Sequence, residues 1–298
     1  MGKTKNHRIK TSIADQATQI IIYLFVGLCG VITLLPFLYV IAGSFATEKE
    51  LTERAFFIVP HTLSINAYQY IIKTGEIFRG LKNSIFLTIF GTAVNMFFTT
   101  TFAYPLSKQH FKGRNLVLNL VIVTMLFSGG MIPTFLVVKG LGLYNSFWAL
   151  ILLGAISPFN MIIVKNFFQE IPKELEEAGI IDGCSDLGIF LKIVLPLSKP
   201  VIASIALFYA VGHWNDYFSA MIYLSDSSKE TVQIVLRRIV LLAQGIQADI
   251  MDYDALGVPP DKAVKMAATV VATVPILIVY PFVQKYFTKG VMIGAVKG

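Results

Sequence analysis

Six long apolar stretches constrain this chain more than any other feature of its sequence. A helix needs about 20 mostly apolar residues to cross the hydrocarbon core of a bilayer, because each residue advances the helix by about 1.5 Å. The sequence therefore predicts an all-α integral membrane protein that forms a single transmembrane domain over residues 1–298. The predicted spans are Ile20–Phe45, Asn83–Ser107, Leu116–Val138, Ser146–Phe168, Val201–Leu224 and Ala267–Phe287.

The composition agrees with a membrane protein. Hydrophobic residues make up 55% of the chain and charged residues only 14%, whereas soluble domains carry about 25% charged residues. The formal net charge of +7 does not indicate nucleic-acid binding, because the basic residues lie in short segments that flank the apolar stretches. That distribution is typical of residues that set membrane topology.

Lysine and arginine are concentrated in alternate connections, which predicts the orientation. Short cytoplasmic loops carry an excess of these residues. The N-terminal tail, the connection with Lys108, Lys112 and Arg114, the segment from Lys165 to Lys199 and the C-terminal tail all fall on one side. We therefore expect both termini in the cytoplasm. The first stretch is longer than the apolar core of a signal peptide and is expected to be a retained span.

The connection between spans four and five has the signals of a short helix outside the membrane. Pro172 suits the first turn of a helix, where no amide donor is needed, and the acidic residues after it complement the positive end of the helix dipole. Gly183 can end the helix in a left-handed cap, and Asp186 could cap the next helix. The chain then bends and returns to the membrane near Pro196 and Pro200.

Two interpretations of this helix remain open from its residues alone. It could be a solvated helix that only joins two spans. Alternatively, Leu175, Ala178 and Ile181–Asp182 form a compact knob that fits a groove on a partner protein. The dense set of caps favours the second interpretation.

The same segment resembles the EAA motif of permease subunits of ATP-binding-cassette importers. The matching pattern is Glu177-Ala178-Gly179, three residues, Gly183, nine residues, Ile193, one residue and Leu195-Pro196. The context from Phe167 to Gly183 resembles the carbohydrate-uptake branch, including the smaller permease of the maltose transporter and permeases for polysaccharides and oligosaccharides. One residue departs from the pattern, because the second alanine of the motif is Gly179 here.

This resemblance implies a type I importer permease with six transmembrane helices and a cytoplasmic coupling helix, within a coupling region over residues 170–196. It implies that Glu177 pairs with a basic group of an ATPase subunit, that Ala178 packs closely, and that Gly183 permits a sharp turn. The residues expected to couple to the ATPase are Glu174, Glu177, Ala178, Gly179, Asp182, Gly183, Ile193, Leu195 and Pro196.

The energy source is expected on another polypeptide, because this sequence contains no G-x-x-x-x-G-K-[ST] phosphate loop. The chain is thus expected to bind no cofactor, and ATP and Mg would be held by the partner ATPase. By resemblance the partners are a second, different permease, two ATPase subunits and an extracytoplasmic substrate-binding protein, in the bacterial cytoplasmic membrane and in contact with lipid.

A cluster of aromatic and polar residues in span five is the candidate substrate contact: Trp214, Asn215, Asp216 and Tyr217. Asp216 is the only acid inside a predicted span, and a buried charge is costly unless it faces a cavity or a partner. Aromatic faces with polar tips suit the C–H faces and hydroxyls of a sugar. The alternative is that the aromatic residues lie at the membrane interface and that Asp216 ties helices together.

Other polar positions are assigned structural roles. Asn95, Asn160 and Thr99–Thr101 lie within spans and are expected to join helices. Ser128–Pro133 interrupts span three, where it could either line an unwound cavity wall or allow close helix packing. Thr231–Gln244 has the spacing of an interfacial helix. The acids Asp249, Asp252 and Asp254 lack the spacing of an EF-hand, so no metal site is expected.

Two other function classes fit less well. A secondary transporter driven by an ion gradient is the main alternative, but it predicts paired ionisable residues at the midplane and usually an internal repeat. Neither feature is evident. A membrane enzyme would need a catalytic constellation, and His7, His61, His110 and His213 do not have the spacing of metal ligands. The chain is therefore expected to be a transport subunit without catalytic activity.

Overall fold

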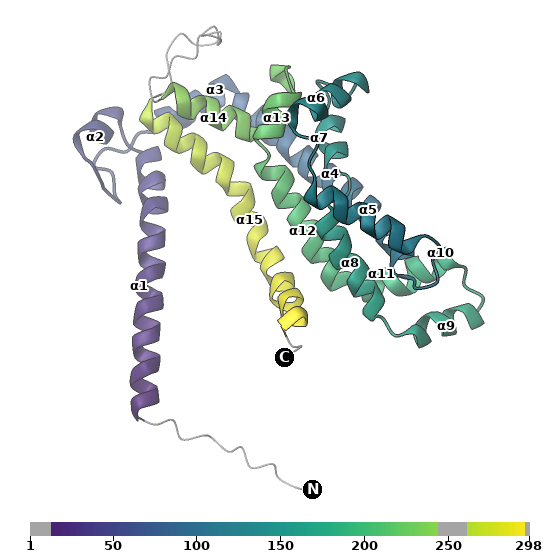
Figure 1. The fold of residues 1–298 in the computed structure, drawn as a ribbon. Helices are drawn as coiled ribbons and strands as arrows, with labels where there is room; N and C mark the ends of the chain where they lie inside the picture. Colours follow the sequence, from purple (N-terminus) through teal and green to yellow (C-terminus); the bar gives the residue numbers. More distant parts are fainter. Residues whose placement is uncertain (1–12, 244–260, 296–298) are drawn as a thin grey trace.

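The computed structural model describes residues 13–243 and 261–295, and within these ranges the regular structure is helical. Figure 1 shows an elongated arrangement in which long helices run between an upper and a lower end. The helices are α1 (Ile13–Ser44), α2 (Glu48–Glu53), α3 (Asn66–Thr74), α4 (Glu76–Ser107), α5 (Arg114–Leu126), α6 (Met131–Gly140), α7 (Phe147–Leu153), α8 (Pro158–Glu170), α9 (Lys173–Ile181), α10 (Asp186–Ile189), α11 (Leu195–Leu197), α12 (Lys199–Asn215), α13 (Phe218–Tyr223), α14 (Val232–Leu242) and α15 (Lys262–Ala295), with a π-helix at Phe190–Val194 and a 3₁₀ turn at Ser227–Lys229.

In the described part of the chain, three continuous helices are long and apolar enough to cross a membrane. They are the segments Thr18–Ser44 of α1, Glu76–Ser107 (α4) and Lys262–Pro281 of α15. Three further spans are possible if each of three bent helix pairs counts as one. These pairs are α5 with α6, bent by 118°, α7 with α8, bent by 53°, and Asp186–Leu197 with α12, bent by 82°.

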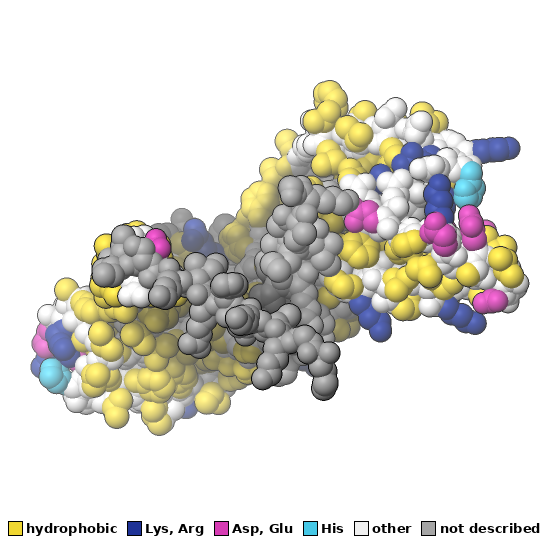
Figure 2. All heavy atoms as spheres, turned by 90° about the horizontal axis from the view of Figure 1, so that it is seen from below, with side chains coloured by type: hydrophobic (Ala, Val, Ile, Leu, Met, Phe, Trp, Pro, Cys, Tyr) yellow, Lys and Arg dark blue, Asp and Glu magenta, His cyan; other side chains and the backbone are white. Residues whose placement is uncertain are grey.

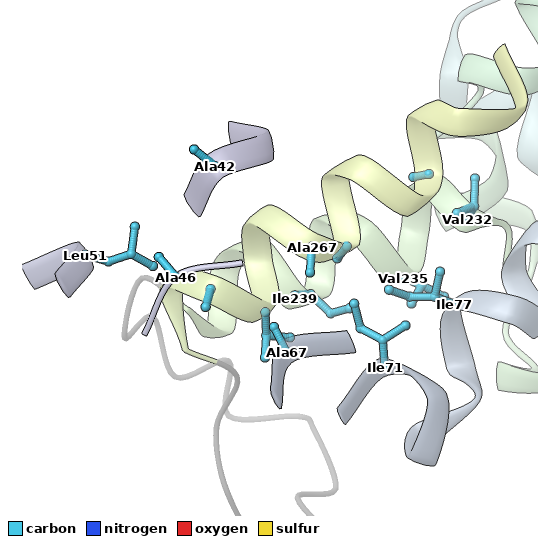
Figure 3. Packing of buried hydrophobic residues seen from close by; sticks show 14 of the residues in the cluster. Ala42, Ala46, Leu51, Ala67, Ile71, Ile77, Val232, Val235, Ile239 and Ala267 are labelled. Carbon is cyan, nitrogen blue, oxygen red and sulfur yellow. The ribbon is translucent and has the colours of Figure 1, made fainter. Parts of the chain in front are cut away.

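Small residues allow α15 to pack closely against its neighbours at the upper end. Ala263, Ala267 and Ala268 of α15 are buried against Ile71 of α3 and Val235 of α14. Figure 3 shows side chains from α3, α4, α14 and α15 meeting in this cluster. Membrane helices associate through such close contacts, because lipid provides no hydrophobic force between them.

The helix α14 differs from the interfacial helix that its spacing predicts. Its apolar side chains Val232 and Val235 are buried in the protein rather than turned toward lipid. On its polar face, Arg238 forms ion pairs with Glu76 at 3.2 Å and with Glu230 at 2.8 Å. The helix is thus a structural part of the upper end.

The lower end carries the segment around α9. In Figure 1 α9 projects from the lower end, the end at which α1 begins and α15 ends, while α2, α3 and α14 lie at the upper end. Figure 2 shows the molecule from below, with charged side chains gathered at the end that carries this segment and apolar side chains over much of the remainder. The fold therefore separates a polar, projecting lower segment from the apolar helices.

Candidate functional site

The helix α9 begins directly after Pro172. The carbonyl of Pro172 accepts a hydrogen bond from the N–H of Leu175 at 3.2 Å, so Pro172 is the residue before the helix and not within its first turn. Glu174 and Glu176 lie in the first turn, where carboxylates favour the positive end of the helix dipole. The predicted helix start is thus correct to within one residue.

Gly183 ends α9 in a left-handed conformation, with φ at +78°. The N–H of Gly183 donates to the carbonyl of Ile180 at 3.0 Å, and the N–H of Cys184 donates to that of Gly179 at 2.9 Å. This pair of hydrogen bonds is a Schellman cap, in which glycine avoids the steric cost of a positive φ. The predicted glycine cap is therefore present.

Gly179 lies on the side of α9 that packs against the segment following it in the chain. This glycine is buried, and a methyl group added to it would lie 2.7 Å from Cδ1 of Ile193 and 3.4 Å from Cγ1 of Ile189. The departure from alanine at this position thus permits α9 to approach the following segment closely. It also brings Gly179 and Ile193, two of the predicted coupling residues, into contact.

The opposite side of α9 is exposed. Ile180 is 60% exposed and Ile181 is 85% exposed, and the side chains of Glu177, Ala178 and Asp182 are exposed beside them. Apolar side chains at this level of exposure, with acidic residues around them, form a surface that can be covered by a partner. We call these five residues the α9 knob.

Contacts with α4 hold this segment in place. Lys108, directly after α4, forms an ion pair with Glu176 of α9, and both side chains are largely buried. The Nζ of Lys108 also lies 4.6 Å above the ring of Tyr104. The hydroxyl of Tyr104 donates to the carbonyl of Asp186 at 3.4 Å. The projecting helix α9 and the long helix α4 are thus linked directly.

The chain after α9 returns through three short helical turns. Ser185 caps α10, because its Oγ accepts from the N–H of Gly188 at 3.2 Å. The prediction that Asp186 is the cap is therefore wrong by one residue, and Asp186 lies in the first turn instead. Leu195 and Pro196 form the start of α11, where proline does not cost a helix hydrogen bond.

The predicted span Val201–Leu224 is not one continuous helix. The helix α12 ends at Asn215, and α13 begins at Phe218. Oδ1 of Asp216 accepts from the N–H of Ser219 at 3.0 Å, so the carboxylate satisfies an amide that the break leaves free. Asp216 therefore lies at a break between two helices, within the range predicted as span five.

Two other members of the candidate substrate cluster, Asn215 and Tyr217, also have local partners. Nδ2 of Asn215 donates to the carbonyl of Val211 at 3.0 Å, and the hydroxyl of Tyr217 donates to Sδ of Met221 at 3.0 Å. Trp214 is only 8% exposed, and its Nε1 has no hydrogen-bond partner. Trp214 thus belongs to the core, while Asn215 is exposed.

A buried polar network joins α4, α12 and the break between α7 and α8. The Nε2–H of His213 donates to Oδ1 of Asn95 at 2.6 Å. Nδ2 of Asn95 in turn donates to the carbonyls of Ile151 and Gly154, at 3.3 and 2.7 Å. This arrangement satisfies two carbonyls at the end of α7, where a broken helix in a membrane needs donors from its neighbours. The structural role predicted for Asn95 is confirmed.

Tyr209 extends this network in a way that the sequence did not reveal. Its hydroxyl accepts from the N–H of Ser157 at 2.8 Å, at the start of α8, and pairs with Oγ1 of Thr99 at 2.7 Å. Thr100 and Thr101 instead bond to carbonyls of their own helix. A signal was present in the sequence, since Tyr209 and His213 are four residues apart and therefore lie on one face of α12.

The described part of the chain contains no group of three or more His, Cys, Asp or Glu residues that could hold a metal ion. Asp249, Asp252 and Asp254 lie outside the described residues.

Comparisons with known proteins assign the chain to a family. Residues 101–293 match the family described as "Binding-protein-dependent transport system inner membrane component". Protein LplC of Bacillus subtilis (strain 168) is 57% identical over 292 residues, which cover 98% of this chain and 99% of that protein. The polygalacturonan/rhamnogalacturonan transport system permease protein YtcP of the same organism is 54% identical, covering 93% of this chain and 97% of the relative.

A solved structure has the same fold. It is the crystal structure of a bacterial ABC transporter involved in the import of the acidic polysaccharide alginate. One of its chains matches with a TM-score of 0.84 and 31% identity, covering 94% of this chain and 99% of that chain. The chain therefore belongs to the family of binding-protein-dependent transport system inner membrane components, as a non-catalytic permease subunit of an ATP-binding-cassette importer.

Proposed function

We propose that this permease carries a sugar, oligosaccharide or polysaccharide and forms one half of a translocation pore. The relatives named for polygalacturonan/rhamnogalacturonan, the arabinooligosaccharide transport system permease AraQ, and the alginate transporter all support a carbohydrate. All three matches cover at least 93% of this chain. The expected substrate class is therefore a carbohydrate polymer or its fragments.

The assembly that we propose contains a second, related permease, two ATPase subunits that hold ATP and Mg, and an extracytoplasmic substrate-binding protein. The family description supports dependence on a binding protein. In this proposal both termini and the α9 knob lie on the cytoplasmic side, and α2, α3 and α14 face the binding protein. The basic residues Lys108, Lys112 and Arg114, in the connection that follows α4 at the same end of the molecule, support that orientation.

The observation that carries the proposal is the α9 knob itself. Exposed Ile180 and Ile181 stand beside the acidic side chains Glu177 and Asp182. The knob is held rigidly by Gly179 and by the ion pair of Glu176 with Lys108. A short helix with an apolar tip suits a groove on a partner. We propose that Glu177 meets a basic group at the rim of that groove, on the ATPase.

The coupling role that we propose extends over the whole region 170–196. In this proposal, Ile193, Leu195 and Pro196 transmit the movement of α9 to α12, which follows them directly in the chain. Closure of the ATPase would then rotate packed helices as rigid bodies between two states.

For the substrate path we retain three of the four candidate residues. Asn215 is exposed at the helix break, and Asp216 and Tyr217 are half-buried beside it. A break in a spanning helix leaves polar groups available to a ligand. Trp214 is buried in the core and would act only by supporting this break.

A pull-down tests the coupling role. The tagged chain is purified from detergent-solubilised membranes in which the whole transport system is expressed, as wild type and as the double variant Glu177→Ala/Gly183→Asp. We expect an ATPase to co-purify with the wild type and to be lost from the variant. Glu53→Ala, on exposed α2 at the opposite end, is the matched control and should retain the ATPase.

Other outcomes would be decisive. If wild-type protein from active membranes brings no ATPase, the importer assembly fails and a transporter driven by an ion gradient becomes the better explanation. If both variants retain the ATPase, the α9 knob is not the docking element. Uptake of labelled oligogalacturonides, measured in competition with other solutes, tests the carbohydrate class separately.

A further inference from the structure

An apolar run follows α2 at the upper end of the molecule. Residues 55–60 read Ala-Phe-Phe-Ile-Val-Pro, with no charge among them. Phe57 is buried, but Phe56 is 52% exposed, Ile58 46% and Val59 74%. Exposure of neighbouring large apolar side chains to water is unfavourable by about 25 cal/mol for each Å². A connection that faced only water would not be expected to present such a surface.

This run belongs to a closed and well-bonded loop. The N–H of Ser64 donates to the carbonyl of Phe45 at 2.8 Å, which joins the two ends of the segment. Inside the loop, the carboxylate of Glu50 accepts from the N–H of His61 at 2.9 Å and forms an ion pair with Arg54. The exposed apolar side chains are thus held on a defined scaffold.

Aromatic contacts fix the position of this loop along α1. Tyr39 of α1 stacks on Phe56, with ring centroids 5.4 Å apart, and meets Phe57 edge to face at 5.6 Å. Tyr39 lies five residues before the end of α1 at Ser44, which corresponds to roughly 7 Å along the helix axis. In Figure 1 the segment after α2 turns back beside the upper part of α1, on the side away from the other helices. The apolar run therefore reaches below the end of a spanning helix.

We propose that residues 56–59 are inserted into the lipid leaflet at the C-terminal end of α1, at the boundary between headgroups and acyl chains. At that depth the surroundings are lipid, and the neighbouring surface of α1 is itself apolar and exposed. The backbone of an irregular loop needs polar partners, so the boundary suits it better than the hydrocarbon centre. The charge of Arg54, which lies 4.8 Å above the ring of Phe57, is paired with Glu50, so the exposed run itself carries no charge.

The inserted loop would hold the upper end of α1, where this helix also packs against α15; below that contact α1 lies apart from the other helices. This role depends on α1 spanning the membrane and goes beyond the transport function, because it holds for any solute. It also differs from docking of a soluble protein, which would meet the loop only from the aqueous side.

Spin labelling of the assembled importer tests the insertion. Cys29 and Cys184 are replaced by alanine, and a nitroxide is attached at Val59→Cys or, as a matched control, at Glu53→Cys on exposed α2. The complex is reconstituted into vesicles of phosphatidylethanolamine and phosphatidylglycerol. Power saturation then compares access of apolar oxygen with access of a water-soluble nickel chelate.

We expect the label at residue 59 to be accessible to oxygen and protected from the nickel chelate, with an access ratio several-fold higher than at residue 53. Equal access of the nickel chelate at both positions would place the loop in water and overturn the proposal. An immobile label that neither reagent reaches would show that another subunit covers the loop, which also overturns it. A label at Ile58→Cys repeats the measurement if Val59→Cys prevents assembly.

Discussion

Two glycines in the same short helix have different physical roles, and only one of these roles could be predicted from the sequence. Gly183 follows the last turn of α9 with φ at +78° and has no neighbouring atom within 4 Å of an added Cβ. Its role is conformational, and the position of a glycine after a helical pattern is enough to predict it. Gly179 is different, because its role depends on Ile193, which is 14 residues away in the chain. A local pattern could not reveal that contact.

The contact between Gly179 and Ile193 predicts a non-additive pair of substitutions. Replacing Gly179 with alanine gains up to about 1 kcal/mol of helix propensity, but the new methyl group requires Cδ1 of Ile193 to move. Ile193→Val removes that atom and alone costs about 1 kcal/mol. We expect Ile193→Val to cost less in the Gly179→Ala background than in the wild type, as measured by thermal unfolding of the assembled importer. Equal costs in both backgrounds would contradict the contact.

Glu50 predicts a pH dependence in the loop after α1. The N–H of His61 and the neighbouring Arg54 hold the pKa of Glu50 below its ordinary value of 4.5. A carboxyl group whose pKa is lower in the folded state stabilises that state above the unfolded pKa, and this contribution is lost as the pH falls through the folded pKa. We therefore expect the amides of His61 and Thr62 to be protected from hydrogen exchange at pH 6 and to lose protection below pH 4.5.

The control for this prediction is Glu50→Gln, which keeps the shape of the side chain and removes its charge. In this variant the protection of both amides, corrected for intrinsic exchange, should be weak and nearly independent of pH. Equal protection of both amides in the wild type and in Glu50→Gln at pH 6 would rule out a structural role for this carboxylate.

At the scale of elements, apolar run length predicted where helices lie but not where they break. The first, second and sixth runs contain long continuous helices. The third run bends by 118° near Gly130, and its glycines and Pro133 indicate this bend in the sequence. The sequence signals for the breaks near Gly154 and Asp216 are weaker. A helix can break in an apolar environment only if side chains from other helices satisfy its free backbone groups. Because those partners lie on other helices, a count of apolar residues in one run cannot identify them.

The break between α7 and α8 predicts the effect of removing its donor. Asn95→Leu leaves the carbonyls of Ile151 and Gly154 without their side-chain donor and His213 without its acceptor. Hydrogen bonds between membrane helices contribute about 0.6 kcal/mol on average, so the loss of three should destabilise the assembly by about 2 kcal/mol. The measurement is thermal unfolding of the purified complex together with its transport rate.

Thr101→Val is the matched control for this substitution. The hydroxyl of Thr101 bonds only within its own helix, to the carbonyls of Phe97 and Phe98, so its loss should change stability by a few tenths of a kcal/mol at most. If Asn95→Leu and Thr101→Val have equal effects, the network does not stabilise the break.

At the scale of the whole molecule, successive connections of the chain lie alternately at the upper and lower ends. The upper end combines elements from two distant parts of the sequence, α2 with α3 and α13 with α14, and α9 stands at the lower end. Local signals predicted α9 because caps and charges are short-range features. The link from α9 to α4 through Lys108 and Glu176 joins residues that are 68 positions apart and required the structure.

This link predicts a charge-reversal experiment at the level of the assembled transporter. Lys108→Glu or Glu176→Lys alone places like charges together in a largely buried contact and should loosen α9 from α4, so that ATP hydrolysis continues while transport per ATP falls. Combining both substitutions restores opposite charges and should recover much of the coupling. Lys112→Glu, an exposed basic residue in the same connection, is the control for net charge. If transport per ATP in the double variant is no higher than in either single variant, the ion pair does not link the α9 knob to the spanning helices. Movement of the knob must then reach these helices through Gly179 and Ile193 instead.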